Sequence, residues 1–140
     1  MSAQRDRTIQ LYILTGDDFL ASTFVEGLRE QGLNNVVQRI QNGSQLLDDP
    51  ITQNSLAPRL VVLDMRGSKT ESRSFLNDVQ RQTGRQPPIV IAVVDEEDDA
   101  EALAPHKQFV AGQISSKAPA AEFIELVNTQ FAANWAVKPD

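Results

Sequence analysis

The sequence predicts an α/β fold that is built on a parallel β-sheet. Five short apolar runs alternate with segments of helical periodicity between residues 8 and 135. The clearest runs are continuously apolar, which is typical of parallel strands that are covered on both faces. Strict alternation of strands and helices favours right-handed crossovers, with helices on both faces of one sheet.

Composition bounds the domain organisation and the partners. The chain has 140 residues, 41% of them hydrophobic, which fits one globular domain over residues 1–140. The net charge of −6 disfavours nucleic acid and anionic membranes as partners. The longest apolar run, "IVIAVV", is too short to cross a bilayer, and the lack of cysteine suits the cytoplasm. We expect loose termini at 1–7 and 136–140.

The first half of the chain begins with a strand at 8–14, "TIQLYIL". Leu20, Phe24 and Leu28 then recur on one face of a helix, and Gly32 marks its end. The weaker elements that follow are, in order, a strand at 35–40 and a short helix at 43–49.

The second half carries the stronger strand signals, "RLVVLD" at 59–64 and "PPIVIAVV" at 87–94. Between them, a helix at 70–84 turns Phe75, Leu76 and Val79 inward. The remaining expected elements are an acidic helix at 96–104 that Pro105 ends, a strand at 109–115 and a helix at 119–135. His106, directly after the proline, is expected in an exposed loop.

Five strands in this length suit a single flavodoxin-like domain with strand order 2-1-3-4-5. Sites in such sheets lie at the carboxyl ends of the strands. The segments at those ends are "TGDD", "DMRG", "VVDEED" and "SSKAP". A functional site is therefore expected among these four loops.

The chain resembles the receiver (CheY-like) domain of two-component response regulators over nearly its whole length. The resemblance rests on "VVLD", "PPIVIAVV" and "GQISSKAPAAEF". It implies that an acid pair after the first strand binds Mg²⁺ and that an aspartate ending the third strand accepts a phosphoryl group. It also implies a Ser or Thr after the fourth strand and a Lys after the fifth.

Asp64 matches the phosphoacceptor position, because it directly follows the apolar "LVVL". The alternative interpretation is a strand-end aspartate that caps the following loop. In an ordinary receiver, Asp17 and Asp18 would join Asp64 as metal ligands. Without a gap, however, the family's acid pair falls on Thr15 and Gly16, and the two aspartates instead cap the next helix.

Two further positions depart from the family pattern. Val93 stands at the Ser/Thr position and has no hydroxyl. Ser116 stands at the Lys position without a gap, and Lys117 takes that place only if a bulge shifts the register by one residue. The apolar framework is kept while the site positions change, which is typical of an atypical receiver, or pseudo-receiver.

We therefore expect a non-catalytic signalling domain that acts by protein–protein contact, without a cofactor and independently of phosphorylation. Its partner would be a sensor kinase, an effector or a second copy of the chain as a homodimer. The expected partner surface carries Glu96 and Glu97 beside Phe131 and Trp135. No P-loop, Rossmann, nucleophile-elbow or zinc-protease motif indicates an enzyme.

Three alternatives stay open. The first is an ordinary response regulator in a phosphorelay, phosphorylated on Asp64 with Mg²⁺ bound. The second is the N-terminal receiver-like domain of an ATPase of the pilus-assembly or septum-site type. The third is a flavodoxin-like binder of a small ligand. The lack of a phosphate-binding loop after the first strand argues against this third alternative.

Overall fold

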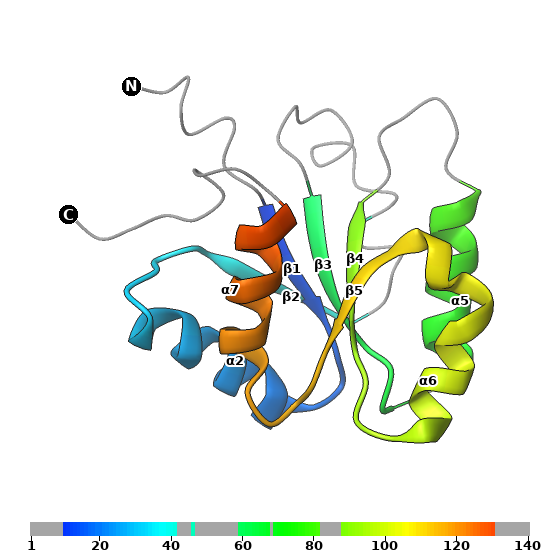
Figure 1. The fold of residues 1–140 in the computed structure, drawn as a ribbon, viewed down its shortest axis with the longest axis horizontal. Coiled ribbons are helices and arrows are strands. Elements are labelled where there is room, and N and C mark those ends of the chain that lie inside the picture. The colour runs from blue at the N-terminus through cyan, green and yellow to red at the C-terminus, as the bar shows by residue number, and fades with distance from the viewer. Residues whose placement is uncertain (1–9, 42–45, 47–58, 68, 82–87, 131–140) are drawn as a thin grey trace.

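The computed structural model describes residues 10–41, 46, 59–67, 69–81 and 88–130. Five parallel strands form one sheet in the order β2-β1-β3-β4-β5, so the predicted order 2-1-3-4-5 is confirmed (Figure 1). The strands are β1 (Gln10–Leu14), β2 (Val37–Ile40), β3 (Arg59–Asp64), β4 (Ile89–Val93) and β5 (Val110–Ile114).

Helices cover both faces of the sheet, as predicted (Figure 1). One face carries α2 (Asp18–Glu30) and α7 (Pro119–Gln130). The other carries α5 (Lys69–Gln80), α6 (Glu97–Leu103) and the 3-10 helix η1 (Ala104–Phe109). Each face therefore has its own hydrophobic core, and the inner strands β1, β3 and β4 are largely covered on both sides.

The core under α2 and α7 depends on the helical spacing seen in the sequence. Leu20, Phe24 and Leu28 are buried on one side of α2. Phe24 meets Phe123 of α7 edge to face, with 5.0 Å between the ring centroids. Gly32, with φ of 79°, ends this segment in a backbone conformation that only glycine adopts readily.

The opposite core joins α5 and α6 to the other side of the same strands. Phe75, Leu76 and Val79 are buried there, as their spacing in the sequence predicts. Ala102 and Leu103 of α6 complete this face. Within the described part of the chain, no helix is long and apolar enough to cross a membrane.

The acidic helix α6 ends at Leu103, just before Pro105, as predicted, but the chain continues directly into η1 with the proline in its first turn. The prediction for His106 is wrong. His106 is only 7% exposed, and its Nδ1 lies 2.9 Å from the Gln80 Nε2 of α5. A continued helical turn carries this ring against α5, where the sequence suggested a loop in water.

Some expectations fall on residues outside those that the structure describes. These are the short helix at 43–49 apart from Leu46, the loose ends at 1–7 and 136–140, and the last turns of the helix at 131–135, with Phe131 and Trp135.

Helices α2 and α7 approach closely at Gly27. A Cβ atom at this position would lie 2.5 Å from the Cβ of Ala120, which is closer than two carbons tolerate. The glycine therefore allows the two helix backbones to come together and bring Phe24 onto Phe123.

Replacing Gly27→Ala should lower the free energy of unfolding by about 1–3 kcal/mol in urea denaturation, because the added methyl overpacks this crossing. The double change Gly27→Ala with Ala120→Gly should recover most of that loss, since it moves the methyl group from one helix to the other. Equal stability of the single variant and the wild type would contradict the close approach.

Candidate functional site

The parallel register brings the carboxyl ends of four strands level with one another. Leu14 pairs with Leu63, Asp64 pairs with Val93, and Val93 pairs with Ile114. Extending the first pairing by one residue places Thr15 beside Asp64. The four loops that the sequence singled out therefore meet at one edge, and Asp64 stands at its centre.

The carboxylate of Asp64 is buried and accepts four hydrogen bonds; the residue is 7% exposed. Its Oδ2 accepts from the hydroxyl of Thr15 at 2.5 Å and from Arg66 Nη2 at 3.1 Å. Its Oδ1 accepts from the backbone N–H and from the Nε of Arg66, both at 2.9 Å. An ionised carboxylate offers about four lone-pair positions. Thr15 and Arg66 therefore occupy the whole acceptor capacity of Asp64.

The loop after β1 follows the ungapped register. β1 ends at Leu14, and α2 begins at Asp18 with Asp17 as its N-cap. The Oδ1 of Asp17 accepts from the backbone N–H groups of Phe19 at 2.9 Å and Leu20 at 3.3 Å. The structure thus gives Asp17 the helix-capping geometry that the ungapped register predicts.

Asp18 takes no part in the site. Its side chain is 90% exposed and pairs with Arg39 of β2. The same arginine donates from Nε and Nη2 to the carbonyl oxygen of Thr15, at 3.2 and 3.1 Å. Gly16, the other residue at the acid-pair position, contributes no side chain.

Arg66 is the functional residue that the sequence analysis missed. Besides Asp64, its Nη2 contacts Asp17 Oδ2 at 2.8 Å, and its Nη1 lies 3.8 Å from Asp95 Oδ2. These contacts, chiefly the hydrogen bonds to Asp64, raise the pKa of Arg66 above its already high ordinary value, so the guanidinium stays protonated. Hydrogen bonding from Arg66, followed by that from the Leu20 amide, lowers the pKa of Asp17. The only sequence signal was a cation two residues after the strand-end aspartate, in "DMRG".

The ends of β4 and β5 complete the site. Val93 is fully buried and apolar, so it offers no hydroxyl. Asp95, two residues later, accepts from the backbone N–H of Ser116 at 2.9 Å and from its hydroxyl. Burial alone would raise the pKa of Asp95, but the hydrogen bonds from Ser116 and the charge of Arg66 together lower the pKa below its ordinary value. Ser116 is therefore engaged with Asp95.

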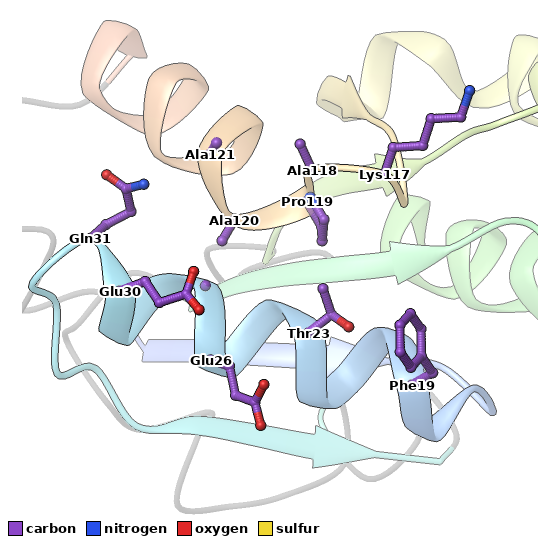
Figure 2. A pocket seen from close by; sticks show the side chains of 11 residues that line it. Phe19, Thr23, Glu26, Glu30, Gln31, Lys117, Ala118, Pro119, Ala120 and Ala121 are labelled. Carbon is purple, nitrogen blue, oxygen red and sulfur yellow. The ribbon is translucent and has the colours of Figure 1, made fainter.

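Lys117 makes no hydrogen bond or ion pair with Asp64, whose carboxylate contacts Thr15 and Arg66. The pairing of β4 and β5 does shift by one residue, between Val90 and Ile91, but Lys117 remains exposed. It lies beside a shallow groove of about 380 Å³ between α2 and α7, and Figure 2 shows its side chain directed away from α2. Phe19, 77% exposed, stands at the same end of the groove.

A receiver-type metal ion does not fit the residues present. Mg²⁺ needs several oxygen ligands in octahedral geometry. Here Asp64 is saturated, and a guanidinium already contacts Asp17, Asp64 and Asp95. Across the described ranges, no group of three His, Asp or Glu side chains is placed to hold a metal. The arrangement can neutralise and orient carboxylates, but it leaves no carboxylate oxygen open at its centre.

Of the expected partner surface, the structure describes the acidic half. Glu96 and Glu97 are exposed at the start of α6. Asp99, one turn on, is buried and accepts from the N–H groups of Asp95 and Glu96 at 3.1 and 3.2 Å. The acidic run is thus partly a helix cap and partly an exposed surface.

The chain resembles solved receiver structures, although its sequence matches no protein-family model and no curated protein. The bacteriophytochrome response regulator RtBRR aligns with a TM-score of 0.69 and 17% identity, over 95% of this chain and 82% of that one. A CheY-like receiver domain from Methylobacillus flagellatus aligns with a TM-score of 0.63 and 15% identity, over 87% of this chain and 98% of that one. The Mn²⁺-bound response regulator Rcp1 aligns with a TM-score of 0.58 and 16% identity, over 95% of this chain and 99% of that one. This protein therefore has the fold of CheY-like response-regulator receiver domains.

Proposed function

We propose that this protein is a cytoplasmic signalling domain of the receiver type that acts through protein–protein contact and does not use a phospho-aspartate switch. The observation that carries the proposal is the saturation of Asp64 by Thr15 and Arg66. A carboxylate attacks phosphorus through an oxygen lone pair. When all its lone pairs accept hydrogen bonds, attack first requires some of them to break.

The surroundings of Asp64 add two obstacles to phosphoryl transfer. The metal that would offset phosphoryl charge has no suitable set of ligands, so transfer lacks its main electrostatic support. Val93 is buried and apolar where the family has a hydroxyl to contact the new phosphoryl oxygens. Both the formation of an acyl phosphate and its read-out are therefore disfavoured.

The geometry also argues against a flavodoxin-like ligand site. Such sites hold phosphate on backbone N–H groups at a helix N-terminus. Here the N-terminus of α2 is capped by the side chain of Asp17, and Asp64 and Asp95 stand nearby around Arg66. Three carboxylates around one guanidinium leave an excess of negative charge, which repels a phosphate group.

The partner surface that we propose lies on α6, β5 and α7. Glu96 and Glu97 project from the start of α6, and Gln113 is exposed on β5 at the edge of the sheet. Phe109, 39% exposed, adds an apolar side chain just before β5. An acidic rim next to an aromatic group suits a basic, partly apolar partner.

Incubation with Mg²⁺ and beryllofluoride should leave the amide spectrum of the wild type unchanged, and acetyl phosphate should leave its intact mass unchanged, because Asp64 has no open oxygen. The control is Asp64→Asn, which cannot accept a phosphoryl group and should give the same result. A saturable change in the wild type that is absent from the Asp64→Asn variant would establish an ordinary receiver instead.

Neutralising the acidic rim with Glu96→Gln and Glu97→Gln should weaken the binding of a lysine-rich amphipathic peptide about fivefold in isothermal titration calorimetry, since two charges at the edge of an interface each contribute modestly. The matched control is Glu26→Gln with Glu30→Gln, which removes the same charge from α2. A peptide that the wild type does not bind, or whose binding responds equally to both pairs, would contradict this surface for a basic partner.

A further inference from the structure

We propose that the Arg66 guanidinium takes the place of a metal ion, as a cation that the chain itself supplies to hold Asp17, Asp64 and Asp95 together. These four residues are called the Arg66 cluster below. The inference rests on the proposed function, since it concerns a site without a phosphorylation cycle, and it adds a reason why the site keeps its shape.

The geometry uses every nitrogen of the guanidinium. Nε contacts Asp64 at 2.9 Å, Nη2 contacts both Asp64 at 3.1 Å and Asp17 at 2.8 Å, and Nη1 lies 3.8 Å from Asp95. Asp64 is the last residue of β3, whereas Asp17 and Asp95 follow β1 and β4. A planar fork with five N–H donors is suited to this bridging, whereas a lysine ammonium would supply a single point charge.

The need for a cation comes from burial. The side chain of Asp64 is 6% exposed and that of Asp95 is 24% exposed, with Arg66 at 25% between them. A buried carboxylate without a counter-charge is costly, and neighbouring carboxylates add repulsion. Asp17, with 39% of its side chain exposed, is better solvated, but it receives a closer contact from Arg66, at 2.8 Å, than Asp95 does at 3.8 Å.

Each carboxylate of the cluster also fixes a different loop. Asp17 caps α2 through the amides of Phe19 and Leu20. Asp95 holds the loop between β5 and α7 through the amide of Ser116. The guanidinium therefore links the start of α2 to the start of α7 across the edge of the sheet. Because the guanidinium is covalently part of the chain, it cannot dissociate as a metal ion can. The Arg66 cluster should therefore not depend on divalent cations.

Two substitutions remove the charge of Arg66 in different ways. Arg66→Ala removes the side chain and leaves room for a small cation, whereas Arg66→Gln keeps much of the stem and some hydrogen bonding without the charge. The matched control is Arg39→Ala, which removes another arginine–aspartate pair at the same edge without touching Asp64.

The readouts are the melting temperature and the amide resonances of Phe19, Leu20 and Ser116, which report on Asp17 and Asp95. We expect Arg66→Ala to lower the melting temperature by about 5 °C and to shift all three amides together. Millimolar methylguanidinium should reverse at least half of both effects. Arg66→Gln should show the same loss without the rescue, and Arg39→Ala should show neither the joint shift nor the rescue. Neither Mg²⁺ nor a chelator should affect the wild type.

Unchanged amides in Arg66→Ala, or a loss that methylguanidinium does not reverse, would overturn the inference, because Arg66 would then act only by packing. A wild type that Mg²⁺ stabilises would overturn it as well. No phosphodonor is used in this experiment. A failed rescue therefore leaves the proposed function standing, while a beryllofluoride response of the wild type counts against the proposed function separately.

Discussion

The ionised carboxylate of Asp64, buried at the edge of the sheet, is the constraint on which the rest of the site depends. Its side chain is only 6% exposed, and a carboxylate so far from water requires hydrogen-bond donors around it. Thr15 and Arg66 supply them. Once Arg66 is drawn inward, its remaining N–H groups are directed at Asp17 and Asp95, so one desolvated charge organises the loops after β1, β3 and β4.

The two cores hold the strands that carry these groups. Packing of α2 and α7 on one face and of α5 and α6 on the other fixes the strands in register. Parallel pairing then places Asp64, Val93 and Ile114 at one level, with Thr15 beside Asp64. The polar cluster therefore sits on a rigid edge, and its side chains need little reorganisation to meet.

Sharing the receiver fold with response regulators does not assign their chemistry, because a fold hosts different sites. The relevant differences here lie in a few side chains at one edge. A threonine hydroxyl and an arginine fill the acceptor positions of Asp64, and Val93 supplies no hydroxyl. The receiver scaffold is retained around these changes.

The sequence by itself determined the five strands, the strand order, the α-helices α2, α5, α6 and α7, and the start of α2. Those features follow from local periodicity, from capping and from the rules for parallel sheets, and each can be read from neighbouring residues. It also identified Asp64, and it placed Thr15 and Gly16 after β1 by the spacing of Leu20, Phe24 and Leu28.

Only the tertiary structure decided the role of Arg66 and the burial of His106. The segment "DMRG" does not by itself predict that Arg66 turns back onto Asp64. That orientation also depends on two carboxylates from other loops, Asp17, 49 positions before Arg66, and Asp95, 29 positions after it. His106 is buried because α5 lies against η1, 26 positions away at Gln80. Packing between distant segments determines the partners of a polar side chain, whereas the local sequence determines only the secondary structure that carries it.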